Sequence, residues 1–177
     1  MKSFTILFLM LLSFNVYSGI EDTCKDTWIY FDLGNTLVNT KDHPNQVKYM
    51  EGALEYLDSL KNAGCTLGLI VNIPEQFGTS YQEKLSTLKK YVEDRWVEDT
   101  PFVWEYFSEI YLPKTNEDLK PKPILFQQVM RNAWKAGKKV FYQGETPKEI
   151  DAAKKEGMTA HLVGSRSDSF YLPVDEI

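Results

Sequence analysis

The fold of this chain is decided by the stretch Trp28-Ile29-Tyr30-Phe31-Asp32-Leu33-Gly34-Asn35-Thr36-Leu37. It opens with aromatic and β-branched residues and changes abruptly at Asp32 to a Gly-Asn turn. An apolar run of this kind, bounded by turn formers, is typical of a buried strand in a parallel sheet. Asp32 is therefore expected at the carboxyl end of a strand, where open α/β sheets place their ligands.

Further along the chain, β-favouring segments alternate with segments whose apolar residues have helical spacing. Strands are expected at 66–71, 104–112, 139–143 and 158–163, and helices at 46–62, 80–96, 123–134 and 147–156. The alternation predicts a Rossmann-like α/β fold, with a central parallel sheet of about five strands and helices on both faces. The helix at 123–134 is expected to turn Phe126 and Trp134 inward, and residues 170–172 to form a packing strand or strap. No long insertion interrupts the pattern, so no substantial cap domain is expected.

The first residues have the layout of a secretory signal peptide. Lys2 precedes an apolar run from Phe4 to Phe14, and Val16-Tyr17-Ser18 fits a cleavage site. The run is shorter than the ~20 apolar residues that a membrane span needs. We therefore expect a signal peptide over 1–18, a single mature domain over 19–177 without a transmembrane segment, and a secreted or periplasmic location.

The charge pattern excludes two classes of partner. The chain has a formal net charge of −5, and its lysines form no cluster larger than the pairs Lys89-Lys90 and Lys138-Lys139. A nucleic-acid-binding protein would present a basic face. Neither nucleic acid nor an anionic membrane surface is an expected partner.

The Asp-x-x-x-Thr-Leu spacing that begins at Asp32 resembles the first motif of the haloacid dehalogenase (HAD) superfamily, most of whose members are phosphohydrolases. In its phosphatases the motif is Asp-x-Asp-x-Thr, in which the first Asp is the nucleophile and the second is the general acid and base. The resemblance implies that Asp32 is the nucleophile and that Thr36 contributes to substrate binding. Gly34 stands in place of the acid–base residue and retains only the backbone carbonyl that binds metal in the family.

The second and third motifs of the family fit unequally. A Ser or Thr hydroxyl that binds phosphate is expected at the end of the second strand, where this chain has Val71, and the amide of the adjacent Asn72 is the alternative donor. The third motif is a lysine that is often followed by Pro-x-Pro, and Lys120 matches it closely. Its ammonium would neutralise the nucleophile and a bound phosphate.

The fourth motif, typically Gly-Asp-x-x-x-Asp, reads Gly144-Glu145 followed by Glu149. The resemblance implies a weak Mg²⁺ site formed by Asp32, the carbonyl of Gly34 and Glu145, and Mg²⁺ tolerates the longer glutamate poorly. For Glu149 the local pattern favours another role. Thr146 three residues earlier, with a proline between them, matches a helix capping box.

Cys24 and Cys65 lie just before the first and second strands, which are neighbours in HAD folds. Export permits a disulfide. The resemblance therefore implies a Cys24–Cys65 bridge at the end of the sheet opposite Asp32, and two unpaired buried thiols are the alternative.

Three functions compete. The losses at Gly34 and Val71 favour a HAD-like hydrolase that is inactive or weakly active as a phosphatase, because acid–base assistance is typically worth about 10²–10⁴ in rate. The alternatives are a functional Mg²⁺-dependent phosphomonoester hydrolase with Asp32 as nucleophile, and a non-catalytic module that binds a protein or ligand in the cell envelope. The expected partner is accordingly a small phosphorylated molecule or an envelope protein.

Overall fold

The computed structural model describes residues 24–42 and 45–177. The predicted signal peptide and its cleavage site lie outside these residues. None of the helices in the described part of the chain combines the length and apolar character needed to cross a bilayer.

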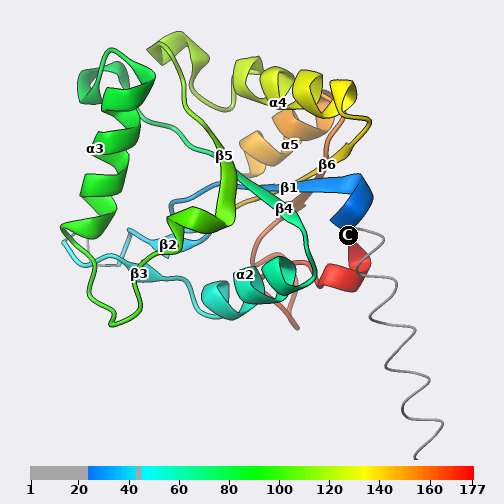
Figure 1. Cartoon of the computed structure of the whole chain (residues 1–177), viewed down its shortest axis with the longest axis horizontal. Helices are drawn as coiled ribbons and strands as arrows, with labels where there is room; N and C mark the ends of the chain where they lie inside the picture. Colours follow the sequence, from blue (N-terminus) through cyan, green and yellow to red (C-terminus); the bar gives the residue numbers. More distant parts are fainter. Residues whose placement is uncertain (1–23, 43–44) are drawn as a thin grey trace, which may run out of the picture.

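A single five-stranded parallel sheet forms the centre of the molecule (Figure 1). Its order is β5-β4-β1-β6-β7, and the first strand of the sequence is therefore central. Phe31 pairs with Leu69 on one side and Gln143 on the other, so Asp32 follows the middle of the sheet. The strands are β1 (Thr27–Phe31), β4 (Thr66–Ile70), β5 (Phe107–Tyr111), β6 (Lys139–Gly144) and β7 (Thr159–Leu162).

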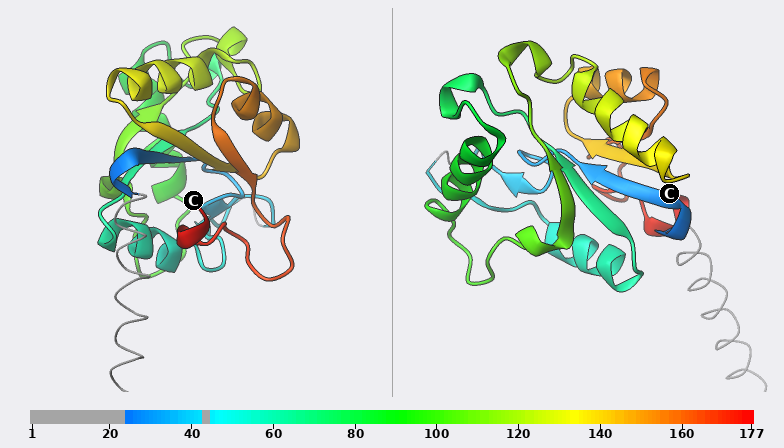
Figure 2. Two further views of the ribbon diagram at one scale, coloured as in Figure 1. Left: turned by 90° about the vertical axis from the view of Figure 1, so that its right-hand side faces the viewer. Right: turned by 45° about the horizontal axis from the view of Figure 1, so that its top comes forward.

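Helices cover both faces of the sheet, as predicted. Figure 2 shows α4 and α5 above the sheet and α2 below it. The buried apolar residues divide in the same way, since α2 and α3 contribute to one core cluster and α4 and α5 to the other. The helices are α2 (Ala53–Asn62), α3 (Tyr81–Glu93), α4 (Ile124–Lys135) and α5 (Pro147–Lys155), with short 3₁₀ turns η1 (Glu75–Phe77), η2 (Trp104–Tyr106), η3 (Asn116–Asp118) and η4 (Val174–Glu176). The predicted fold class is confirmed.

The helix predicted over 46–62 is wrong in its first part. The short strand β3 (Lys48–Tyr49) pairs antiparallel with β2 (Val38–Asn39), and α2 begins only at Ala53. Gly52 has φ 73°, a left-handed conformation that interrupts a helix and that glycine adopts without strain. The ring of Tyr49 is buried against Trp96 and Phe102, which holds this segment extended. Besides this hairpin, two isolated bridges pair residues of the segment between β1 and α2: Gly34 with Val38, and Val47 with Trp96.

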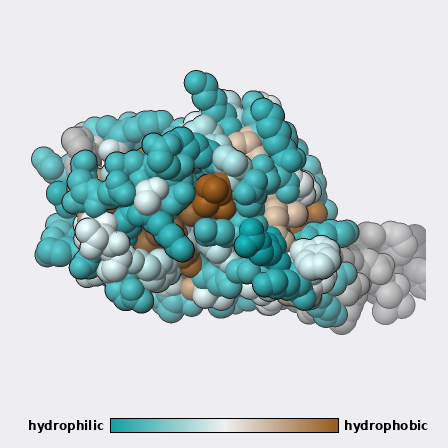
Figure 3. Space-filling model, turned by 90° about the horizontal axis from the view of Figure 1, so that it is seen from above, coloured by the Kyte–Doolittle hydropathy of each residue, from teal (hydrophilic) through white to brown (hydrophobic). Residues whose placement is uncertain are grey.

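Two other predictions need correction. The strand expected from residue 104 begins with the 3₁₀ turn η2, and β5 starts at Phe107. Trp134 is not inward but 80% exposed, because it follows the buried Ala133 by one residue and is turned about 100° away on the helix. The face seen from above, which carries α4, is hydrophilic over most of its area (Figure 3).

The predicted disulfide is present. Cys24 and Cys65 are bonded, with their Cα atoms 4.4 Å apart, and the described residues contain no free cysteine. The two residues precede β1 and β4 at the amino ends of the strands, opposite the end that carries Asp32.

Candidate active site

Asp32 is the first residue after the central strand. Its backbone N–H donates to the carbonyl of Gln143 at 2.9 Å, which continues the β1–β6 ladder by one step. One carboxylate oxygen, Oδ2, accepts a long hydrogen bond of 3.5 Å from the hydroxyl of Thr36. The side chain of Asp32 is 15% exposed, so the carboxylate is held from within the protein and still meets solvent.

Lys120 comes from the loop before α4 and reaches Asp32 across 88 positions of sequence. Its Nζ lies 2.7 Å from Oδ1 of Asp32, 2.8 Å from Oε2 of Glu149 and 3.0 Å from the hydroxyl of Tyr142. The ammonium side chain has no solvent exposure. The structure thus brings the predicted nucleophile and the predicted lysine into direct contact.

Asn72 fixes the backbone of this lysine. Its Oδ1 accepts from the Lys120 N–H at 2.7 Å, and its Nδ2 donates to the Lys120 carbonyl at 3.0 Å. The same Nδ2 lies 3.4 Å from Oε1 of Glu149. The amide proposed as a phosphate donor is therefore engaged in positioning Lys120. Val71 beside it is buried in the core.

The buried cluster shares one ammonium between two carboxylates. Burial opposes the charge of Lys120, but Asp32, Tyr142 and Glu149 together hold its pKa above the ordinary value. Burial raises the pKa of Glu149, and repulsion by the charge of Asp32 adds to this, so the attraction of Lys120 opposes the rise only in part. Burial also raises the pKa of Tyr142, whose hydroxyl donates to Glu149 at 3.1 Å. Lys120 is thus charged and Tyr142 neutral near neutral pH.

Glu149 belongs to this cluster and does not cap a helix. Pro147 starts α5 as predicted, but the side chain of Thr146 makes no capping hydrogen bond. The interpretation as a capping box is therefore wrong. Glu149 is instead buried, because it supplies part of the negative charge that a buried ammonium needs. The sequence did contain a signal for this, namely the second acidic position of the Gly-Glu-x-x-x-Glu pattern.

Gly34 and Glu145, the other two predicted metal ligands, have different neighbours. Gly34 forms an isolated bridge with Val38, and a Cβ added to it would lie 3.5 Å from the hydroxyl oxygen of Thr40. The carboxylate of Glu145 is paired with the ammonium of Lys41 at 3.2 Å. Lys41 was not identified from the sequence, because nothing in its local pattern distinguishes it from other surface lysines.

The donors fit a divalent ion poorly. Within residues 24–42 and 45–177, no three His, Cys, Asp or Glu side chains are grouped so that they could hold a metal. Asp32 and Glu145 each face a lysine already, and Gly34 offers only its carbonyl. Mg²⁺ prefers near-ideal octahedral oxygen ligation. A magnesium ion at this site would have to displace Lys41 from Glu145.

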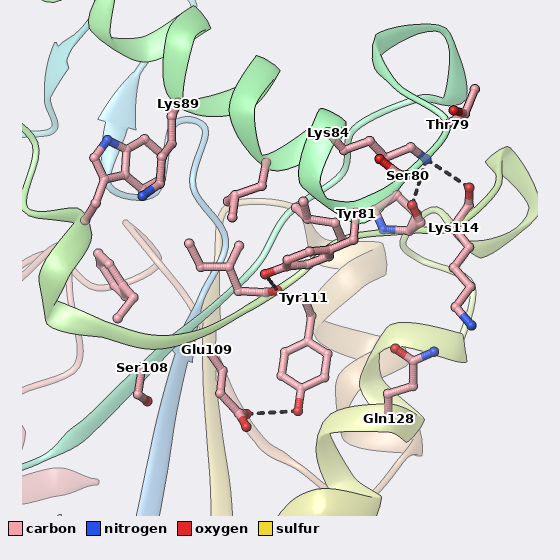
Figure 4. Close-up of a pocket in the computed structure, with 16 residues that line it drawn as sticks. Thr79, Ser80, Tyr81, Lys84, Lys89, Ser108, Glu109, Tyr111, Lys114 and Gln128 are labelled. Carbon is pink, nitrogen blue, oxygen red and sulfur yellow. Dashed lines mark hydrogen bonds between the residues drawn. The ribbon is translucent and has the colours of Figure 1, made fainter.

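Two cavities differ in their relation to this site. The smaller, of about 300 Å³, is lined by residues that include Asn35, Lys41 and Glu145, so it lies over the carboxyl ends of β1 and β6. The larger, of about 780 Å³, lies between α3 and β5, away from these strand ends (Figure 4), and neither cavity has Asp32 or Lys120 in its lining. In Figure 4 the ammonium of Lys84, one of the lining residues, points toward the backbone near Lys114. The smaller cavity is the one that adjoins the candidate site.

A profile of the family described as haloacid dehalogenase-like hydrolase matches residues 38–163, which include Lys120, Glu145 and Glu149 but begin after Asp32. No curated protein matches the chain.

Among solved structures, a hydrolase from Streptococcus pneumoniae TIGR4 has a TM-score of 0.56 and 15% identity, covering 80% of this chain and 94% of that chain. The D,D-heptose 1,7-bisphosphate phosphatase from B. bronchiseptica, complexed with magnesium and phosphate, has a TM-score of 0.54 and 15% identity, covering 78% and 80%. A HAD family enzyme from Bacteroides thetaiotaomicron, complexed with magnesium and inorganic phosphate, has a TM-score of 0.54 and 13% identity, covering 81% and 97%. At these identities the likeness concerns the fold alone. The family profile covers well over half of the sequence, and the chain belongs to the haloacid dehalogenase-like hydrolase family.

Proposed function

We propose that this protein is a HAD-type hydrolase in which Asp32 accepts a phosphoryl group from a small phosphorylated molecule and then releases it slowly. The observation that carries the proposal is the contact between a partly exposed carboxylate, Asp32, and a fully buried ammonium, Lys120, at 2.7 Å. Lys120 neutralises charge beside the phosphorus and holds Oδ1, which leaves Oδ2 as the attacking oxygen. The fold neighbours that hold phosphate support this substrate class.

The first step forms a bond between Oδ2 of Asp32 and phosphorus while the bond from phosphorus to the leaving oxygen breaks. The leaving oxygen departs with the electron pair and needs a proton. Gly34 cannot supply one, so only leaving groups that are stable as anions, such as aryl or acyl oxygens, depart readily. Water must then hydrolyse the aspartyl phosphate without a general base at Gly34, which slows the second step by about 10²–10⁴.

Magnesium is a weakly bound ion in this proposal, because it has to displace Lys41 from Glu145. The chemistry above needs no step from it. The support for magnesium binding is indirect: two structures with a similar fold are complexed with magnesium.

The test is to mix the full chain with an aryl phosphate and follow both phenolate release and intact mass. We expect a burst of about one phenolate per protein, a mass increase of one phosphoryl group on Asp32, and slow release afterwards. Asp32→Asn should abolish both. Asp151→Asn, at an exposed residue of α5, is the matched control and should leave both unchanged.

Restoring the missing carboxyl and hydroxyl groups tests whether their loss is the cause of slow turnover. Gly34→Asp together with Val71→Ser should raise steady-state turnover by up to about 10²–10⁴. The Cβ at position 34 has ordinary contact room, with its nearest neighbour at 3.5 Å. Wild-type turnover at ordinary enzyme rates, about 1–10³ s⁻¹, would contradict the proposal of a slow enzyme. Complete absence of labelling at Asp32 would favour a non-catalytic module that binds a protein or ligand in the envelope.

The place of action in this proposal is outside the cytoplasm, in the periplasm or the medium. The Lys2 and Phe4–Phe14 layout supports it, and so does the Cys24–Cys65 disulfide, because disulfides persist in oxidising compartments. Intact-mass measurement of protein recovered from the envelope or medium tests it, and retention of residues 1–18 would reject the predicted cleavage.

A further inference from the structure

We propose that Lys41 is a tethered cation that replaces a divalent metal in this site, so that a phosphate anion binds beside Asp32 through Lys41 and without a metal. The inference deepens the proposed function and rests on it for the location of the anion. Three features of the described residues carry it: the partner of Lys41, the loop that presents it, and the place of this loop beside Gly34.

The partner of Lys41 is the acidic residue that the resemblance assigns to the metal. Lys41 Nζ lies 3.2 Å from Oε2 of Glu145, just after the end of β6. Asp32 follows the adjacent strand, and its N–H bonds to the carbonyl of Gln143, two residues before Glu145. The ammonium therefore lies over the same pair of strand ends as the nucleophile, where an added positive charge acts on the phosphate.

The loop that presents Lys41 is held by two asparagine side chains. Oδ1 of Asn39 accepts the N–H groups of Lys41 and Asp42, both at 3.2 Å, and Nδ2 of Asn39 donates to the Asp42 carboxylate at 2.6 Å. Oδ1 of Asn35 accepts from the N–H and the hydroxyl of Thr40, at 3.2 and 3.3 Å. The backbone on both sides of Lys41 is thus fixed. This limits the entropy lost when its exposed ammonium binds an anion.

The same loop lies beside the position from which the missing acid would project. A Cβ on Gly34 would meet the hydroxyl oxygen of Thr40 at 3.5 Å, next to Lys41 in sequence. Among the ion-paired groups alone, the carboxylates of Asp32, Glu145 and Glu149 against the ammoniums of Lys120 and Lys41 leave one net negative charge. Asp42, whose carboxylate accepts from Asn39, lines the same cavity and is outside this count. Without Lys41 there would be two, which is the charge that a divalent cation neutralises. Lys41 therefore removes both a ligand and the charge that would attract a metal.

The experiment measures binding without turnover, using inorganic phosphate and Mn²⁺ as separate probes in titration calorimetry on the full chain. Wild-type protein should bind phosphate equally well in a chelator and in excess Mg²⁺. Lys41→Met keeps most of the apolar stem and should weaken phosphate binding about threefold to tenfold while tightening Mn²⁺ binding by a similar factor. Glu145→Gln releases Lys41 and should strengthen phosphate binding.

Lys90→Met is the matched control, because Lys90 is an exposed lysine on α3 paired with Asp94 at 2.8 Å and its loss changes net charge equally. It should alter neither affinity by more than about twofold. Thermal melting should show all variants folded. The proposal is overturned if wild-type phosphate binding is undetectable or requires Mg²⁺, if Lys41→Met leaves both affinities unchanged, or if Lys90→Met reproduces its effects.

Failure of the proposed function is distinguishable from failure of this inference. Asp32→Asn leaves the Lys41–Glu145 pair in place, so a Lys41-dependent phosphate affinity should persist in that background. Absence of phosphoryl labelling at Asp32 would reject the nucleophile and leave the tethered cation standing. If Asp32 is labelled but phosphate binds equally well with and without the Lys41 ammonium, the role given to Lys41 is rejected and the proposed function is not.

Discussion

Among the residues that the structure describes, two lysines are buried, and their surroundings differ. Lys120 at the candidate site contacts two carboxylates and a tyrosine hydroxyl. Lys84 on α3 is 1% exposed, and its Nζ donates to the backbone carbonyls of Pro113 and Lys114 at 2.7 and 2.9 Å. Within the described residues Lys84 has no ion pair.

The difference shows that burial of an ammonium does not by itself mark a reactive site. The ammonium of Lys84 is compensated by hydrogen bonds to backbone carbonyls of a loop. These bonds connect α3 to the segment after β5, so the role of Lys84 is structural. Lys120 instead compensates charges that the protein has placed on Asp32 and Glu149, and its loss would leave those charges facing each other. The partners of a buried charge, more than its depth, indicate its role.

Removal of the ammonium at position 120 should have the largest effect. Lys120→Met leaves Asp32 and Glu149 buried without a cation, and we expect unfolding free energy to fall by about 3–5 kcal/mol. Urea unfolding followed by circular dichroism measures it. A loss below about 1 kcal/mol would mean that the cluster is more hydrated than its burial indicates.

The matched change at the other lysine should cost less. Lys84→Met retains the apolar stem and leaves two carbonyls without their donor, which we expect to cost about 1–3 kcal/mol. The same urea titration compares the two variants directly. If both variants lost the same unfolding free energy, the proposed difference between an ammonium compensated by carbonyls and one compensated by carboxylates would be wrong.

Removal of the one hydroxyl in the cluster should lower the unfolding free energy by less than either lysine substitution. Tyr142→Phe removes the group that accepts from Lys120 and donates to Glu149. We expect a loss of about 0.5–1.5 kcal/mol, since the ion pairs remain. Tyr91→Phe, at an exposed tyrosine of α3, serves as the control and should be nearly neutral.

The smallest expected effect is a change in the pH dependence of stability. Burial raises the pKa of Glu149 above its ordinary value of 4.5, so the folded protein retains a proton there that the unfolded chain has lost. Glu149 therefore stabilises the folded state most at and below pH 4.5, and this contribution is lost as pH rises through the raised pKa. The stability of wild type relative to Glu149→Gln should fall from acid toward neutral pH, measured by urea midpoints. A rise would show that the attraction of Lys120 outweighs burial.

The strands and the position of Asp32 at the end of β1 could be predicted because short-range patterns determine them. An apolar run that ends at Asp32 needs only a parallel sheet to become β1, and its central position follows from burial on both faces. The hairpin at β2 and β3 could not be predicted, because Tyr49 finds its packing partners about fifty residues away, at Trp96 and Phe102. Glu149 was misassigned for a similar reason: the capping pattern is local, whereas the charge of Lys120 comes from another loop.

The segment after β7 determines how late in synthesis the loop after Asp32 can be stabilised. The hydroxyl of Tyr171 donates to the carbonyl of Thr36 at 2.6 Å across 135 positions of sequence, and its ring stacks on Tyr56 with centroids 4.6 Å apart. Tyr56 in turn donates to the carbonyl of Leu172 at 2.7 Å. The loop that follows Asp32 thus acquires these supports only when ribosomes have released residue 172. Nascent chains halted earlier would carry Asp32 beside an unsupported loop, so synthesis itself delays the time at which the candidate site can be assembled.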